Sequence, residues 1–382
     1  MRRKRSHKLR NILIFCLILC CAGISVGLYY YNQHRSQASL NQRPALVKAK
    51  DGTSISPAHL KIETYKKKLS KDYPQLYTAA YDVPKNTKIG ADVIIPGQAV
   101  SRVYNAKRKA LVNSTTMTPQ GLALADKYIL ITAYDSSHQN NSIIYVIDKS
   151  SGKYLKTLYL DGKPHLGGIA YDPVAKKIWI TGTTDGQAAL MSFPLKEVEN
   201  YNYSKNRKFL KCDDAIALPA IQQASCVTYY DNQLFVGFFN EYGNGQIAAY
   251  PIARREPFKD SITSDQIKAV TGKVSWSAGA GSTSMDRQIQ GIAFSDNYII
   301  LSQSYGTKNS KLYFFPISAI SNLDEKNAEK VIEMPPYLEQ IDAVDGQLLM
   351  LYESGAKAYA KNNIMTMDRV ISANINSLIG SN

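Results

Sequence analysis

A short phrase recurs five times along this chain of 382 residues, and each copy opens a run of strand-like segments. The copies occupy residues 121–124, 168–171, 226–229, 291–294 and 340–343. Intervals of roughly 45 to 65 residues with several strands per copy are typical of a β-propeller, whose blades cannot bury their faces alone. We therefore expect an all-β fold. Five blades are preferred, and a strand at residues 101–104 leaves a sixth, degenerate blade open.

Four strands are expected in each complete repeat, as in residues 120–124, 128–134, 142–147 and 154–160 of the first. In the third repeat the fourth strand is expected at residues 266–270. The fifth repeat supplies three strands and then the chain ends. We expect the strand at residues 110–114 to complete this last blade, because a closed ring leaves no exposed strand edge.

Phrases such as residues 170–173 with 178–181, and the turn from Asp148 to Gly152, resemble repeats of the SMP-30-, NHL- and YVTN-type bacterial β-propellers. The resemblance covers residues 110–376 and consists of generic strand and turn phrases. It implies the superfamily and assigns no catalytic residue. Several enzymes of that superfamily hold a metal ion at the channel mouth, but no matching set of side chains is recognised here.

The N-terminus has the pattern of a signal-anchor. An uncharged apolar segment, residues 12–31, is long enough for a transmembrane helix across a hydrocarbon core of about 30 Å. The basic residues before it should stay in the cytoplasm, which predicts an extracellular C-terminal domain on the bacterial cell surface. These basic residues are Arg2, Arg3, Lys4, Arg5, Lys8 and Arg10. The alternative is a cleaved signal peptide, which would release a secreted protein.

Four regions follow from these signals: a cytoplasmic basic tail (1–11), a transmembrane signal-anchor (12–31), an extracellular stalk with a short helix (32–97) and the propeller domain (98–382). The helix is expected to start near Ser56 and to stop before Pro74, with Leu60, Tyr65 and Leu69 on one apolar face. The stalk's first residues, up to about 50, show no apolar periodicity.

The formal net charge of +15 is partly due to the basic tail. The remaining excess of lysine and arginine favours an anionic partner such as a cell-wall polymer, although a solvated lysine-rich surface has the same composition. The membrane, through the N-terminal helix, and a protein are the other expected partners. Nucleic acid is not expected, since the basic residues form no single stripe in an exported chain.

In propellers, the connections that enter each first strand and those that leave each second strand meet around the mouth of the central channel. The repeat register therefore predicts a ring of polar and aromatic side chains at this mouth. Amide and hydroxyl groups of this kind bind neutral or sugar-like ligands in a concave site. The candidate ligand-binding residues are Gln120, Tyr134, His165, Gln290, Glu339 and Glu353.

Catalytic chemistry is less well marked. Glu339 and Glu353 are a candidate carboxylate pair for acid–base work, and either could instead be simply hydrated. No cysteine and histidine cluster has zinc spacing, and no acidic loop fits calcium, so no metal or cofactor is expected. The leading hypothesis is thus ligand binding by a membrane-anchored extracellular propeller. The alternative is a propeller hydrolase or lyase acting on saccharides or lactones.

Overall fold

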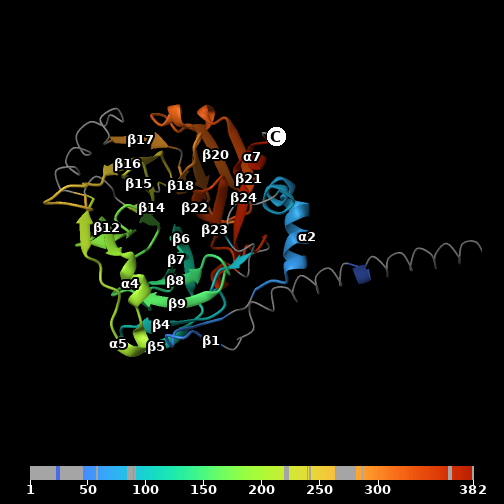
Figure 1. The fold of residues 1–382 in the computed structure, drawn as a ribbon. Coiled ribbons are helices and arrows are strands. Elements are labelled where there is room, and N and C mark those ends of the chain that lie inside the picture. The colour runs from blue at the N-terminus through green and yellow to red at the C-terminus, as the bar shows by residue number, and fades with distance from the viewer. Residues whose placement is uncertain are drawn as a thin grey trace, which may run out of the picture.

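Figure 1 shows the computed structural model of the chain. The structure describes residues 23–25, 46–56, 59–83, 89, 92–218, 223–238, 240, 242–262, 281–285, 287–359 and 364–380. The predicted basic tail and all but three residues of the predicted membrane segment lie outside these ranges. Within them, no helix combines the length and the apolar character needed to cross a membrane.

Five antiparallel sheets of four strands follow one another along the chain. The first contains β6 (Met117–Ala125), β7 (Tyr128–Asp135), β8 (Ile143–Asp148) and β9 (Tyr154–Tyr159). The second contains β10 (Ile169–Asp172), β11 (Lys177–Thr184), β12 (Gln187–Pro194) and β13 (Asp214–Ala217). The third contains β14 (Ala224–Tyr230), β15 (Gln233–Phe238), β16 (Gly245–Pro251) and β17 (Gly281–Met285).

The last two sheets complete the series. The fourth contains β18 (Ile289–Phe294), β19 (Tyr298–Gln303), β20 (Ser310–Pro316) and β21 (Lys330–Met334). The fifth contains β22 (Leu338–Val344), β23 (Gln347–Tyr352), β24 (Arg369–Asn374) and a strand from far upstream, β3 (Val93–Ile94).

The first strands of these sheets form a closed cycle of contacts. Strand β6 contacts β10, β10 contacts β14, and the series continues through β18 and β22 back to β6. In Figure 1, β6, β14, β18 and β22 lie near the middle of the molecule, with β9, β12, β17 and β20 farther out. This arrangement of four-stranded sheets, each with its first strand innermost, is that of a β-propeller.

Close approach of the inner strands explains the glycine that opens three of the recurring phrases. A Cβ atom on Gly168 would lie 2.4 Å from the backbone nitrogen of Val227 and 2.7 Å from the Cα atom of Cys226. The amide of Gly168 instead donates to the hydroxyl of Thr181 on β11, at 2.8 Å. The repeat is thus a packing requirement at the centre of the ring.

Strand β3 closes the ring, which corrects one expectation. Arg369 and Val370 of β24 pair with Ile94 and Val93 of β3, so an N-terminal strand does complete the last sheet. Residues 110–114, expected in this role, form β5 (Ala110–Ser114) and pair with β4 (Ser101–Asn105). The physical reason is local: a four-residue connection ending at Lys109, with φ of 48°, folds β4 and β5 directly into a hairpin.

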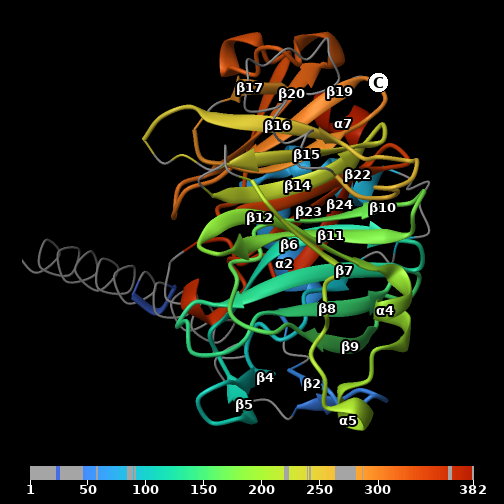
Figure 2. The same cartoon turned by 90° about the vertical axis from the view of Figure 1, so that its left-hand side faces the viewer.

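A sixth sheet lies outside the central cycle. It has the order β1 (Val47–Lys48), β2 (Ser54–Ile55), β4 and β5. Ile55 and Val103 of this sheet share a buried cluster with Ile131 of the first sheet and Leu349 of the fifth. The sheet therefore packs across the junction between the first and last sheets of the ring, at the lower end of the molecule in Figures 1 and 2.

The expected helix is α2 (Ile62–Asp72), which begins later than predicted and ends before Pro74 as predicted. It continues into α3 (Pro74–Tyr77) and the π-helix η1 (Thr78–Asp82). Tyr65 and Leu69 are buried in one cluster with the fourth and fifth sheets. The short helices elsewhere connect strands: α4 (Leu195–Asn200), α5 (Tyr203–Asn206), η3 (Ile317–Ala319), η4 (Glu325–Asn327), η5 (Lys357–Tyr359) and α7 (Ile375–Ile379).

One further strand differs from the prediction. The fourth strand of the third sheet is β17, at Gly281–Met285, which pairs with β16. The expected segment, residues 266–270, lies outside the described residues. The sequence of β17 is made mostly of glycine, serine and threonine, so it has no apolar alternation to mark it. A strand at this outer position is held by backbone hydrogen bonds, which need no particular side chain.

Candidate functional site

The predicted mouth residues occupy irregular positions in the inner strands. Pairing with the second strand shifts register between Pro119 and Leu122, Ala224 and Cys226, Ile289 and Gly291, and Leu338 and Ile341. Such β-bulges redirect side chains and are frequent beside active sites. Gln120, Ser225, Gln290 and Glu339 all lie within these shifts. The bulges thus explain why the residue just before each phrase does not follow the alternating side-chain direction of the strand.

Three of the six predicted residues line one cavity. Gln290, Glu339 and Glu353 border a space of about 470 Å³, together with Ser304, Tyr305, Gly306, Tyr337 and Tyr359. These residues come from the fourth and fifth sheets and from the irregular segment after β23. A volume of this size suits a small ligand. We call this space the mouth cavity.

Gln120 and Tyr134 lie beside the same carboxyl groups from the first sheet. The amide nitrogen of Gln120 donates to a carboxyl oxygen of Glu353 at 2.8 Å. Burial, followed by the negative charges of Glu353 and Glu339, raises the pKa of Tyr134 to about 12. The first and fifth sheets therefore bring Gln120, Tyr134, Glu339 and Glu353 into one polar cluster.

His165 lies at the edge of this cluster rather than in the mouth cavity. Its ring centre is 4.3 Å from that of Tyr134. The His165 side chain is exposed, on the connection that leads into the second sheet. The structure thus places His165 against an aromatic neighbour of the two carboxyl groups, without bringing it among the residues that line the mouth cavity.

The two glutamates form the electrostatic centre of the site. Glu339 is 4% exposed and Glu353 is 8% exposed. Burial and then the neighbouring charge of Glu353 raise the pKa of Glu339 well above its ordinary value. Burial raises the pKa of Glu353 to about 8, even though hydrogen bonds from Tyr359 and Gln120 favour its ionised form.

Within the described part of the chain, neither glutamate forms an ion pair. A buried pair without a cation holds at least one proton at neutral pH, since two adjacent buried negative charges repel each other. A protonated carboxyl group donates a hydrogen bond and an ionised one accepts, so the two groups together can do both. The pair can therefore bind a hydroxyl or amide group, or pass a proton to one.

Two residues of the site were missed by the sequence reasoning. Tyr359, on η5, hydrogen-bonds to Glu353, and its ring centre lies 4.3 Å from that of Tyr337. It follows β23 in an irregular segment, where no repeat register applies. Gln340 opens the fifth phrase where three other phrases have glycine. This departure was the one feature of the sequence that could have indicated a special role for Gln340. Its buried amide bonds to the backbones of the first, second and third sheets.

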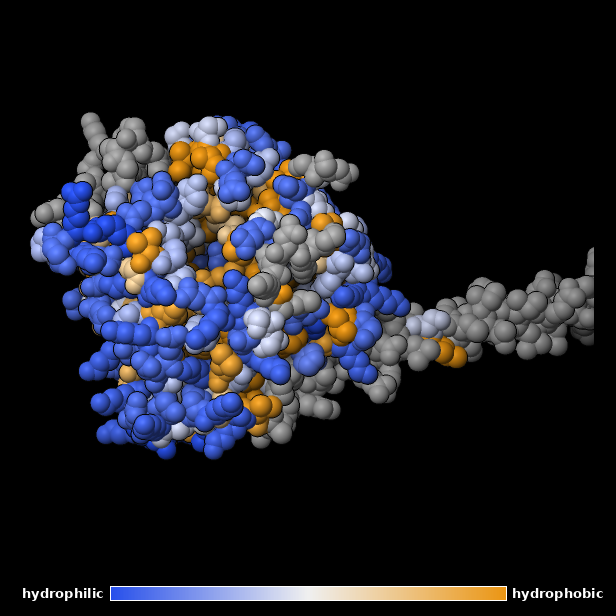
Figure 3. All heavy atoms as spheres, viewed as in Figure 1, coloured by the Kyte–Doolittle hydropathy of each residue, from blue (hydrophilic) through white to orange (hydrophobic). Residues whose placement is uncertain are grey.

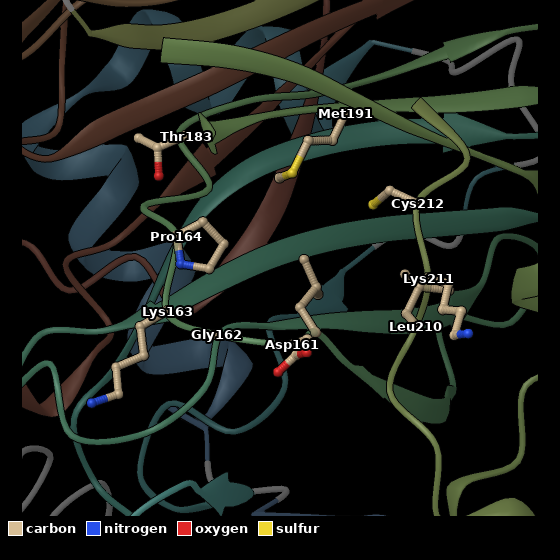
Figure 4. Close-up of a pocket in the computed structure, with 10 residues that line it drawn as sticks. Asp161, Gly162, Lys163, Pro164, Thr183, Met191, Leu210, Lys211 and Cys212 are labelled. Atoms are coloured by element: carbon tan, nitrogen blue, oxygen red, sulfur yellow. The ribbon is translucent and has the colours of Figure 1, made fainter. Parts of the chain in front are cut away.

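A second cavity, of about 570 Å³, lies apart from the predicted site (Figure 4). It is bordered by the connection that leaves the first sheet and by strands of the second. Its lining residues are Leu160, Asp161, Gly162, Lys163, Pro164, Thr183, Met191, Leu210, Lys211 and Cys212. Burial raises the pKa of the Cys212 thiol to about 11, so this free thiol stays protonated at neutral pH.

The fold and the bulged inner strands together define the chain as a β-propeller with a polar cavity at the inner edge of its sheets. No protein-family model matches the sequence, and no curated protein matches it. Solved structures with a similar fold include the glutaminyl cyclase of Myxococcus xanthus, with 11% sequence identity and a TM-score of 0.41. This match covers 72% of the present chain and 94% of the cyclase.

Two further structural neighbours are enzymes. The PQQ-bound aldose sugar dehydrogenase of Streptomyces coelicolor is 12% identical with a TM-score of 0.39, covering 76% of this chain and 99% of that one. A gluconolactonase of Xanthomonas campestris is 10% identical with a TM-score of 0.35, covering 76% and 89%. Similarity at this level assigns none of their activities, and the site must be judged from its own residues.

Proposed function

We propose that this protein is a membrane-anchored extracellular β-propeller whose mouth cavity binds a neutral polar ligand, such as a sugar or an amide-bearing envelope component. The observation that carries the proposal is the mouth cavity itself, which is bordered by two buried glutamates and three tyrosines. Aromatic faces and paired hydrogen-bonding groups are the usual means of binding hydroxyl-rich molecules. The anchor is residues 12–31, as the sequence predicts.

The contact cycle supports five blades in this propeller. Strands β22 and β6 contact each other directly, which leaves no inner position for a sixth sheet between them. The sheet of β1, β2, β4 and β5 then serves as a cover over the junction where the ring closes. Strand β3 pairs with β24 and so supplies the fourth strand of the last sheet.

A second candidate function is acid–base catalysis, favoured by the raised pKa of both glutamates. A carboxyl group that is protonated at neutral pH can donate a proton to a leaving group, while its partner accepts one. Saccharides and lactones are the substrate classes to which this chemistry applies. The same residues would bind the substrate, so the two functions share one site and differ in whether a bond is broken.

The test uses the full chain in detergent micelles with a panel of neutral saccharides, N-acetylated sugars and lactones. Binding by isothermal calorimetry should weaken at least about tenfold in Gln290→Ala, which removes a lining amide. Gln187→Ala, an exposed change at the first residue of β12, is the matched control and should bind as the unmodified protein does. If no panel member binds, or if Gln290→Ala binds as well as the control, the ligand-binding proposal fails.

Product analysis with the same panel separates the two functions. Catalysis predicts turnover that is lost in Glu353→Gln while binding persists, because the amide keeps the shape of the carboxyl group but cannot donate its acidic proton. Binding without turnover supports the receptor function. Turnover that survives both Glu339→Gln and Glu353→Gln would exclude these glutamates as the acid and base.

A further inference from the structure

The sheet that covers the ring junction carries a concentration of positive charge that the mouth cavity does not use. Eight lysine and arginine side chains are exposed on β1, on the β4–β5 hairpin and on the segment around α5. We call this surface the basic end. Its residues are Lys48, Lys50, Lys107, Arg108, Lys109, Lys205, Arg207 and Lys208.

Close contacts join the three segments. A Cβ atom built on Gly52, in the β1–β2 turn, would lie 1.9 Å from the hydroxyl of Ser204 on α5. The rings of Tyr104 on β4 and Phe209 have centres 4.8 Å apart. Figures 1 and 2 both place β4, β5 and α5 at the same end of the molecule, beside β9.

Acidic side chains are almost absent from these segments. Across residues 46–55, 101–114 and 201–211 the sole acidic residue is Asp51. Asp51 is 8% exposed and accepts hydrogen bonds from the amide and the hydroxyl of Thr53, at 3.0 and 2.7 Å. Among the described residues, none of the eight cations forms an ion pair. The positive charge is therefore not neutralised within this part of the chain.

An exposed apolar side chain lies beside these cations. Val47 on β1 is 49% exposed and precedes Lys48 directly. Figure 3 shows the lower end of the molecule as mostly hydrophilic. A basic surface with an isolated apolar side chain is the composition that proteins use at the interface of an anionic membrane.

We propose that the basic end lies against anionic lipid headgroups of the membrane that holds residues 12–31. This inference depends on the membrane attachment proposed above, and not on the ligand of the mouth cavity. Residues 32–45 separate the apolar segment from the first described residues before β1, and a chain of 14 residues reaches at most about 50 Å when fully extended. The first described strand after the anchor thus starts within reach of the membrane surface.

The charge and the short link act together. Each lysine or arginine near an anionic surface is attracted over about one Debye length, roughly 8 Å at physiological ionic strength. None of the eight cations lines the mouth cavity. Headgroup binding at the basic end would therefore use residues other than those that line the mouth cavity.

The test compares full-length protein in nanodiscs of neutral phosphatidylcholine with nanodiscs containing about one-third phosphatidylglycerol. Amide hydrogen exchange of the hairpin residues 104–111 should slow at least about tenfold in the anionic nanodiscs. The original exchange rate should return in 0.5 M salt, because salt screens the attraction between the cations and the headgroups. Charge reversal of Lys107, Arg108 and Lys109 to glutamate should abolish the difference. The matched control reverses Arg255, Lys259 and Lys308, exposed cations in the loop after β16 and the loop between β19 and β20, and should keep the difference.

Equal exchange in both nanodiscs would overturn the proposal, as would protection that survives the hairpin charge reversal. Protection produced only by a soluble polyglycerol phosphate, in neutral nanodiscs, would also overturn it and indicate a wall polymer instead. Carbonate extraction tests the anchor separately, since release of the protein would contradict the attachment itself. Gln290→Ala should leave lipid protection unchanged, so failure of the ligand proposal remains distinguishable.

Discussion

The side chain of Gln340 joins three sheets at the centre of the ring. Its carbonyl oxygen accepts from the amides of Leu122 and Ile169, at 3.3 and 3.0 Å. Its nitrogen donates to the carbonyl oxygens of Ile169 and Val227, at 2.7 and 3.0 Å. Gln340 is 2% exposed, so these backbone groups have no ready access to water as a substitute partner.

Replacement of Gln340 by alanine should therefore destabilise the protein strongly. The change leaves several buried backbone groups without a partner, at about 1–3 kcal/mol for each group that stays unsatisfied. We expect the free energy of unfolding, measured by urea denaturation, to fall by about 3 kcal/mol or more. The exposed change Gln187→Ala should alter it by less than about 0.5 kcal/mol. A similar small effect for Gln340→Ala would contradict this role.

Glu353 makes stability depend on pH in a defined direction. Its pKa is about 8 in the folded protein, compared with 4.5 as the ordinary value. The folded state thus holds the proton more tightly, so the contribution of Glu353 to stability is greatest below about pH 4.5 and is lost as pH rises toward 8. One such group contributes a slope of at most about 1.4 kcal/mol per pH unit.

Glu353→Gln should flatten this part of the stability profile, because the amide does not ionise and removes the charge next to Glu339. The measurement is chemical denaturation at several pH values between 4.5 and 8. Glu197→Gln, a change of an exposed glutamate on α4, is the control and should run parallel to the unmodified protein. Parallel profiles for both variants would show that Glu353 is not a buried, raised-pKa group.

Among the elements, α2 is bound to the ring by both apolar and ionic contacts. Leu69 is fully buried against the fourth and fifth sheets. At the start of the helix, Arg369 on β24 donates to the carbonyl oxygen of Leu60 at 2.9 Å, and its guanidinium lies 4.3 Å from the ring centre of Tyr65. Asp368 accepts from Arg369 at 2.8 Å and also from the amide of Leu60.

Truncation of Leu69 to alanine tests whether α2 is part of the folded unit. Loss of a fully buried leucine side chain costs about 2–5 kcal/mol when the site cannot collapse. We expect a decrease of this size in the free energy of unfolding, with a single cooperative transition. Glu63→Ala, on the exposed face of the same helix, is the control. If Leu69→Ala behaves like the control, α2 is only loosely attached.

Element prediction from the sequence succeeded where repeats supplied several independent signals. The phrase in each inner strand begins with glycine, cysteine or glutamine and continues with buried apolar residues. Aligning these five phrases gave the positions of the predicted mouth residues. Strand β3 could not be found in this way, because it has two residues and pairs with β24 more than 270 positions away. The pairing of β5 was also not evident from the sequence. Residues 110–114 pair with the neighbouring strand β4 and not with the last sheet of the ring.

At the site, the register located Gln120, Tyr134, Gln290, Glu339 and Glu353 near one another. It could not predict how deeply the two glutamates are buried, because burial depends on side chains from three different sheets. Tyr359 was missed for a related reason: it reaches Glu353 from an irregular segment that no other repeat contains. The repeat thus predicts where the mouth residues lie, whereas contacts from other sheets and from an irregular segment determine their burial and hydrogen bonding.

The whole molecule combines a closed ring, a covered junction and a mouth cavity with a pair of glutamates. Closure by β3 ties the chain before the repeats to the last sheet, so the N-terminal segment and the ring are held as one structure. The basic end lies on the cover and the mouth cavity on the inner strands. The proposed membrane contact and the proposed ligand binding therefore involve different residues of one propeller.

The expectation for the site is that Glu339 and Glu353, which both border the mouth cavity, hold at least one proton between them at neutral pH. It is tested most directly by carbon-13 NMR titration of the full chain labelled at the glutamate carboxyl carbon, with Glu339→Gln and Glu353→Gln for assignment. We expect one glutamate carboxyl group to remain protonated at pH 7, to titrate near pH 8 and to be altered in both variants. If every glutamate titrates near its ordinary value of 4.5, the two glutamates are not a buried pair with raised pKa values.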